Sequence, residues 1–175
     1  GCGVGGDVIT FIRDIENLDY MEAVRLLSDR SGLPMPDDGF DDGARRLRQT
    51  LLEINRETAR FFHNELKTQR GRKAYEYLKD RRLTDDTIRH FGLGYSPDSF
   101  DALLNHLKSK GFREPDIVLA NVAANGKTGK PYDRFRNRIM FPIIDLRGNV
   151  IAFGGRIMPG LEGAKYINTA DTPIY

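Results

Sequence analysis

The hydrophobic pattern of the chain changes from a helical period to an extended one at Tyr132, and this change constrains the fold most. Upstream of it, apolar residues recur every three to four positions, as on one face of a helix. Downstream, strand-like runs at 138–146 and 150–157 are joined by Arg147-Gly148-Asn149, which predicts a β-hairpin with a short turn. This order of elements predicts an α+β fold, in which a helical N-terminal half precedes a small, mostly antiparallel sheet.

The helical half divides into segments whose ends carry capping residues. Two short helices are expected near the N-terminus, and the second starts with a capping box of Asp19 and Glu22 and ends at Gly32. A long amphipathic helix should follow, because one apolar stripe runs from Leu47 to Leu66. Further helices are expected after Gly71, after Thr84, from Pro97 to Gly111 and within 115–124.

The two strands of the predicted hairpin contain residues that weaken a sheet. Pro142 lacks a backbone donor, so the first strand should lie at a sheet edge or carry a bulge. In the second strand, Gly154 and Gly155 leave one face nearly bare around Arg156. Glycines in a strand mark either the close approach of a ligand or another backbone, or a packing bulge, and both explanations remain open.

Charge is distributed unevenly along the 175 residues, although the formal net charge is only +2. Residues 1–43 are strongly acidic, whereas 45–82 and 127–165 are basic. Two basic segments favour a polyanionic partner, because Lys and Arg displace counterions from phosphates. The alternative is that these segments are solvated helix faces. No stretch approaches the roughly 20 apolar residues of a membrane span, so no membrane partner is expected.

Cys2 is the only cysteine, which rules out an internal disulfide and is typical of a reducing compartment. A cytoplasmic location is therefore expected, and the N-terminus does not resemble a signal peptide. A closed zinc site needs about four nitrogen or sulfur ligands, and the three histidines stand at no ligand spacing. However, many zinc-ribbon knuckles end in a GCG stretch. Cys2 is either a ligand separated from an upstream part of such a site or a free thiol.

The sequence shows no catalytic arrangement of nucleophile, acid and base, and its candidate functional groups are cations. Arg134, Arg136 and Arg138 occupy alternate positions and would lie on one side of an extended chain. Three like charges on one face require an anion between them. The convergence of these residues with Arg156 is a hypothesis, because the sequence does not determine how the strands pair.

Lys165, Tyr166 and Asn168 place a cation, an aromatic ring and an amide close together in the chain. This combination suits a nucleotide, with the cation for phosphate, the ring for stacking and the amide for a base edge or sugar. The alternative is that Tyr166 packs in the core while Lys165 is solvated.

Residues 132–156 read YDRFRNRIMFPIIDLRGNVIAFGGR, and KYINTADTPIY follows at 165–175. These stretches resemble the bacterial DNA primase family (the DnaG type). In addition, GCGVGGDVITFIRDIENLDYMEAVRLLSDRSGL resembles the end of that family's zinc-binding domain, and RRLTDDTIRHFGLGYSPDSFDALLNHLKSKGF the helical part of its polymerase core. The resemblance implies a helical remnant of the zinc-binding domain at 1–33, an acidic flexible linker at 34–44 and the N-terminal subdomain of the catalytic core at 45–175.

The resemblance also implies a function: a part of a DNA-directed RNA polymerase that makes short RNA primers on single-stranded DNA during replication. Structural Zn²⁺ would use Cys2 as its last ligand, and catalytic Mg²⁺ or Mn²⁺ would bind Toprim residues outside this chain, so the chain alone should be inactive. The implied partners are the DNA template, ribonucleoside triphosphates, the RNA primer and, through a C-terminal domain, the replicative helicase. The alternative is a non-catalytic adaptor that binds nucleic acid or protein.

Particular residues inherit expected roles from this resemblance. Arg134, Arg136 and Arg156 match a basic template groove, and Arg138 joins them on the alternating pattern. Arg81 matches a further template contact, although its neighbour Arg82 fits nearly as well. Lys165 and Tyr166 are expected to bind the nucleotide, and Asn168 the template.

Overall fold

The structure, a computed structural model, describes residues 6–33 and 42–175. The chain divides into two compact units, Gly1–Asp42 and Gly43–Tyr175, and each is described by itself. The expected linker at 34–44 lies mostly outside the described residues, as does Cys2. Within the described ranges, no helix combines the length and the apolar character that a membrane span requires.

The first unit contains the two short helices expected from the sequence, α1 (Val8–Glu16) and α2 (Tyr20–Ser31). The capping box of Asp19 and Glu22 is present in both directions, so two backbone N–H groups at the start of α2 are satisfied. Gly32 ends α2 in the left-handed region, with φ of 68°. The buried core of this unit consists of Ile12, Leu18 and Ala23.

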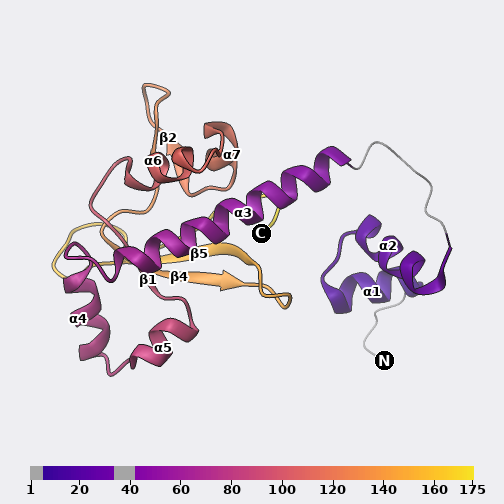
Figure 1. The fold of residues 1–175 in the computed structure, drawn as a ribbon, viewed down its shortest axis with the longest axis horizontal. Helices are drawn as coiled ribbons and strands as arrows, with labels where there is room; N and C mark the ends of the chain where they lie inside the picture. Colours follow the sequence, from indigo (N-terminus) through magenta and orange to yellow (C-terminus); the bar gives the residue numbers. More distant parts are fainter. Residues whose placement is uncertain (1–5, 34–41) are drawn as a thin grey trace. The chain divides into compact units, whose positions relative to one another are not determined.

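The second unit is built on α3 (Asp42–Glu65), the long helix predicted from the apolar stripe. Figure 1 shows α3 running along the sheet, with α4 and α5 near one end of the helix and α6 and α7 beside β2. Leu51, Ile54 and Phe62 are completely or almost completely buried on the inner face of α3. The shorter helices are α4 (Arg72–Asp80), α5 (Asp85–His90), α6 (Ala102–Ser109) and α7 (Glu114–Leu119).

The main sheet has four antiparallel strands in the order β1-β4-β5-β6, and β2 and β3 form a separate hairpin. The predicted hairpin is present as β4 and β5, so the α+β fold is confirmed. Gly148 has φ of 85° in its turn, a conformation in which a side chain would be strained. The strands are β1 (Gly94–Ser96), β2 (Ala123–Asn125), β3 (Pro131–Asp133), β4 (Arg138–Ile144), β5 (Val150–Ile157) and β6 (Tyr166–Asn168).

Pro142 occupies the kind of position that its missing N–H requires. β1 pairs only with residues 138–140 of β4, so Pro142 lies beyond the end of β1, where that side of β4 behaves as an edge. In addition, the pairing of β4 with β5 shifts by one residue between Ile143 and Ile144, which is a β-bulge or irregularity. Both features expected from Pro142 are therefore present.

The two faces of the main sheet are covered differently. Phe153 of β5 packs edge to face on Phe62 of α3, with ring centroids 5.7 Å apart. On the opposite face, Ile139 is fully buried in a second cluster with Ala74 and Leu78 of α4. The sheet thus has one face against α3 and another that α4 covers near β1.

The structure differs from the sequence-based expectation around α6. The helix expected from Pro97 begins only at Ala102, and residues 97–101, which follow β1 (Gly94–Ser96), are irregular. Asp133 of β3 accepts hydrogen bonds from the backbone N–H groups of Leu103 and Leu104, at 2.8 and 2.9 Å. The start of α6 therefore depends on a carboxylate distant in sequence, which local patterns near Pro97 do not reveal.

Candidate nucleic-acid interface

The register of the main sheet determines which side chains share a face. Directly opposite residues on neighbouring strands point to the same side, and Gly154 pairs with both Phe141 and Asn168. Because Phe153 points to α3, its neighbour Gly154 points to the other side. We call the residues on that side the open face: Ile139, Arg156 and Tyr166 in one row, and Phe141, Gly154 and Asn168 in the next.

A cluster of cations and aromatic rings lies where α4 meets the open face. The guanidinium carbon of Arg156 lies 4.9 Å from the ring centroid of Tyr77 and 6.0 Å from that of Tyr166. Arg81 lies 5.2 Å from the ring of Tyr77, and Lys165 lies 5.9 Å from that of Tyr166. We call these five residues the cation–aromatic cluster. It brings together four of the residues predicted from the sequence.

Tyr77, which joins Arg81 to Arg156, was missed by the sequence analysis. Lys73, Tyr77 and Arg81 are spaced by four residues and so lie along one flank of α4. This spacing is the signal that could have found Tyr77. The hydroxyl oxygen of Tyr77 is buried and has no hydrogen-bond partner among the described residues.

The charge of Arg156 is not balanced by a nearby carboxylate. Among the described residues, it forms no ion pair, and its Nε is buried without a hydrogen-bond partner. Stacking on Tyr77 holds the guanidinium in place without neutralising it. A fixed, unpaired cation beside an exposed tyrosine favours an anionic ligand that carries a flat ring.

Arg134 and Arg136 lie in an irregular segment before β4 and diverge from each other. Arg134 donates from Nη2 to the backbone oxygen of Asn168 at 3.1 Å, so it reaches the edge of the open face. Arg136 instead stacks on Phe100, with its guanidinium carbon 3.8 Å from the ring centroid. The expected alternation fails here because the strand starts only at Arg138 and because Asn137 is left-handed, with φ of 51°.

The structure contradicts the expectation that Arg138 shares a surface with Arg156. Arg138 is only 8% exposed, and its Nη1 donates to the backbone oxygens of Gly155 and Ala164 at 3.1 and 2.9 Å. Burial lowers the pKa of its guanidinium. Arg138 pairs with Ile157, which places it on the face opposite to Arg156. The reason is the one-residue shift at 143–144, since a slip of one residue sends each side chain to the other face.

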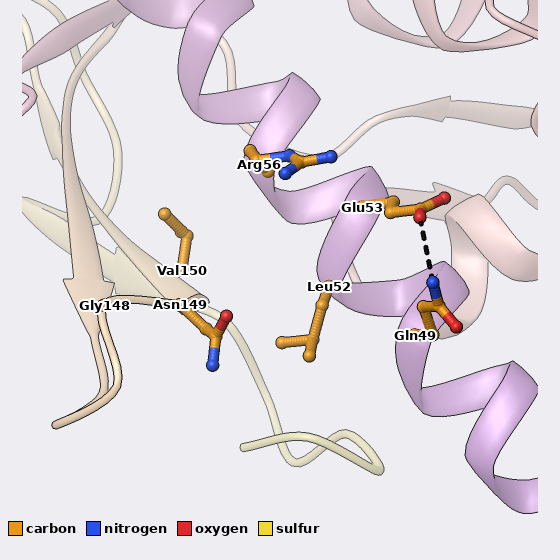
Figure 2. A pocket seen from close by; sticks show the side chains of 7 residues that line it. All are labelled: Gln49, Leu52, Glu53, Arg56, Gly148, Asn149 and Val150. Atoms are coloured by element: carbon orange, nitrogen blue, oxygen red, sulfur yellow. Dashed lines mark hydrogen bonds between the residues drawn. The ribbon is translucent and has the colours of Figure 1, made fainter.

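A separate hollow lies between α3 and the β4–β5 turn (Figure 2). Its volume is about 310 Å³, and Leu52 and Val150 contribute apolar surface. Glu53 and Arg56 contribute one charge of each sign, so the hollow carries no excess positive charge and does not favour a polyanion. The lining residues are Gln49, Leu52, Glu53, Arg56, Gly148, Asn149 and Val150.

The described residues do not provide a metal centre. Within residues 6–33 and 42–175, no three or more His, Cys, Asp or Glu side chains gather where they could hold an ion. A tetrahedral zinc site requires about four ligands, and catalytic magnesium usually requires carboxylates. The described residues therefore fit neither ion.

Fixed arginines beside an exposed tyrosine are the groups with which proteins hold the phosphates and stack the bases of single-stranded nucleic acid, so the site defines a nucleic-acid-binding class. Comparison with known families agrees with this class. Residues 61–175 match the family described as "DNA primase catalytic core, N-terminal domain", and residues 1–42 match the "CHC2 zinc finger". The chain belongs to the family of the N-terminal domain of the DNA primase catalytic core.

Individual relatives support the same assignment. The chain is 39% identical over its whole length to a DNA primase of Pseudomonas aeruginosa, of which it covers 27%. A solved DnaG primase catalytic domain bound to ssDNA matches 75% of the chain, with a TM-score of 0.70 and 34% identity, and 42% of that structure is covered. The zinc-binding and RNA polymerase domains of the Aquifex aeolicus primase match the whole chain, with a TM-score of 0.67 and 31% identity, and 41% of that structure is covered.

The chain thus spans between a quarter and a third of the length of the curated relatives that it resembles. Both parts of the expected resemblance, to the zinc-binding domain and to the polymerase core, are confirmed by these matches.

Proposed function

We propose that the chain is the template-binding part of a DNA primase, a DNA-directed RNA polymerase that makes short RNA primers for replication. The observation that carries this proposal is the cation–aromatic cluster, which gathers predicted site residues on one face of a domain that belongs to the primase core family. A related catalytic domain bound to ssDNA supports the same ligand class.

In this proposal the arginines of the cluster hold the phosphates of a single strand. Arg81 and Arg156 flank the ring of Tyr77, so their guanidinium groups are held where two phosphates of one strand can reach them. Arg134, anchored on the backbone of Asn168, and Arg136 would extend this path. The cluster supplies affinity without sequence preference, because phosphate contacts carry no base information.

Lys165 and Tyr166 would bind the ribonucleoside triphosphate next to the template. Tyr166 is 60% exposed, so its ring is available for stacking, and Lys165 lies against the same ring as an exposed cation. Exposure of Tyr166 argues against the alternative that it packs in the core. Asn168 is also exposed, and it would contact a base edge or sugar of the template.

The remaining parts of the primase reaction are assigned outside the described residues. Structural Zn²⁺ would bind with Cys2 in a CHC2 zinc finger, and catalytic Mg²⁺ or Mn²⁺ would bind elsewhere in the protein, because the described residues form no metal cluster. The RNA primer and the replicative helicase are further proposed partners, and we expect the protein to act in the cytoplasm. The division into 1–33, 34–44 and 45–175 likewise remains a prediction.

A titration of the 175-residue chain with a fluorescently labelled single-stranded oligodeoxynucleotide tests this proposal. We expect binding whose logarithm falls linearly with the logarithm of the salt concentration, because counterions are released. Binding should tolerate changes of base sequence, and the chain alone should synthesise no primer. A chain that does not bind the oligonucleotide even at low salt would contradict the proposed function.

A further inference from the structure

The second row of the open face forms a slot that the proposed template contacts do not use. Phe141, Gly154 and Asn168 lie side by side on three neighbouring strands. Because adjacent strands are about 4.8 Å apart, the outer two residues stand roughly 10 Å from each other. Gly154 has no side chain, so only the side-chain oxygen of Asn168 reaches over the middle of this row.

The two glycines of β5 are explained differently by their surroundings. A Cβ on Gly155 would lie 3.0 Å from atoms of both Phe135 and Arg138, so packing on the α3 face requires this glycine. A Cβ on Gly154 would meet only the side-chain oxygen of Asn168, at 3.3 Å, and Gly154 does not have a positive φ. Asn168 is exposed, so its side chain can move to make room. Packing of the folded chain therefore requires glycine at position 155 but does not require it at position 154.

The row also carries an aromatic ring that is only partly covered. Ile139, two residues before Phe141 on the same face, is completely buried under α4, whereas Phe141 is 37% exposed. The cover provided by α4 thus ends between these two residues. In strands that bind single-stranded nucleic acid, an exposed aromatic residue on the sheet surface serves to stack a base.

We propose that an unpaired nucleobase lies over Gly154 and stacks against Phe141. Asn168 borders the slot on its other side, where its amide can reach a base edge. Arg156 lies two residues from Gly154 on the same face, roughly 7 Å along the strand, where it can bind the phosphate of the same nucleotide. This inference rests on the proposed function and adds Phe141 and Gly154 to its binding surface. The base can come from the template strand or from a free nucleotide.

Filling the slot tests its use without disturbing the fold. A Gly154→Val variant places a β-branched side chain in the strand, so the free energy of unfolding should be unchanged or increased. Affinity for an oligodeoxythymidylate should nevertheless fall about fivefold to hundredfold, the range expected for losing one stacked base. Gly155→Ala is the matched control for the stability measurement. In contrast to Gly154→Val, it should lower the free energy of unfolding, because its Cβ would crowd Phe135 and Arg138. If the affinity of Gly154→Val is unchanged both for the oligonucleotide and for ATP, the proposal is overturned.

A tryptophan reporter locates the base directly, because the chain contains no tryptophan of its own. Phe141→Trp should bind the oligonucleotide as tightly as the wild type, and its fluorescence should be quenched on binding. The control is Leu119→Trp, at a residue that is 40% exposed in α7, a helix that packs against β2 and α6. This tryptophan should not be quenched.

The two sources of the base give different results with the same reporter. Quenching of Phe141→Trp by the oligonucleotide alone assigns the slot to the template, and quenching by ATP assigns it to the incoming nucleotide. Saturated binding of the oligonucleotide, with no quenching at position 141 by either the oligonucleotide or ATP, would overturn the slot while leaving the proposed function intact. If the wild-type chain itself does not bind, the proposed function fails instead.

Discussion

Replacing Arg156 by alanine should weaken binding of single-stranded DNA and also reduce its dependence on salt. Arg156 is partly buried between Tyr77 and Tyr166 and forms no ion pair among the described residues, so its charge is available to a phosphate. One charge-assisted contact at such a half-exposed position contributes about 1–2 kcal/mol, or roughly fivefold to thirtyfold in affinity. The loss should be largest at low salt.

The salt dependence of binding provides a second quantity by which this prediction can be tested. One phosphate contact on a single strand contributes about 0.7 to the slope of log K against log salt, so Arg156→Ala should lower the slope by about 0.7. Raising salt from about 50 to 200 mM should then shrink the difference between wild type and variant about 2.5-fold. Fluorescence anisotropy with a labelled oligonucleotide measures both quantities.

A second arginine variant serves as a control, because it shows whether the loss of affinity comes from the contact of Arg156 with a phosphate or only from the loss of one positive charge. Arg56 lines the hollow between α3 and the β4–β5 turn, away from the open face, and Arg56→Ala removes the same charge. The Arg56 variant should retain the wild-type affinity and nearly the wild-type slope. Equal slopes for wild type and Arg156→Ala, or equal losses for both variants, would refute the assignment of Arg156 to a phosphate.

Three further predictions concern stability and are measured by urea denaturation. Arg138→Ala should lower the free energy of unfolding by about 2–3 kcal/mol, because two buried carbonyl oxygens lose their donor, and a change of less than about 0.5 kcal/mol would contradict this role. Arg82→Gly should raise the free energy of unfolding by about 0.5–1 kcal/mol, because Arg82 has a left-handed backbone with φ of 63° that glycine adopts without strain. A decrease would show that contacts of the Arg82 side chain outweigh this strain. Burial raises the pKa of Asp133, so between its ordinary value near 4 and this raised value the folded state holds a proton that the unfolded state has lost. Stability should therefore fall as pH rises through that window, and Asp133→Asn should remove this dependence; an identical pH profile in the variant would exclude Asp133 as its source.

The sequence predicted those elements whose determinants are local. The capping box of Asp19 and Glu22 and the turn at Gly148 each involve residues a few positions apart, so their patterns can be recognised without the fold. The start of α6 could not be predicted in this way. Its cap comes from Asp133, about thirty residues away, and only the folded chain brings them together.

The candidate site was partly predictable for the same reason. Residue types predicted Arg156 and Tyr166 as candidate binding groups, and the resemblance to the primase family added Arg81. The structure gathers all three around Tyr77. The side of the sheet to which each arginine side chain points was not predictable, because it depends on the register of the hairpin. The one-residue shift between 143 and 144 turns Arg138 to the α3 face, and no residue type in the turn reveals that shift.

The central claim is that single-stranded DNA lies on the open face of the sheet beside α4. Amide chemical-shift mapping of the ¹⁵N-labelled chain during titration with a short oligonucleotide tests it most directly. The account predicts that the largest perturbations fall on Tyr77, Gly154, Arg156 and Tyr166, whereas Glu53 and Asn149 at the hollow of Figure 2 remain unchanged. Perturbations that concentrate at that hollow and leave Arg156 unaffected would contradict the account.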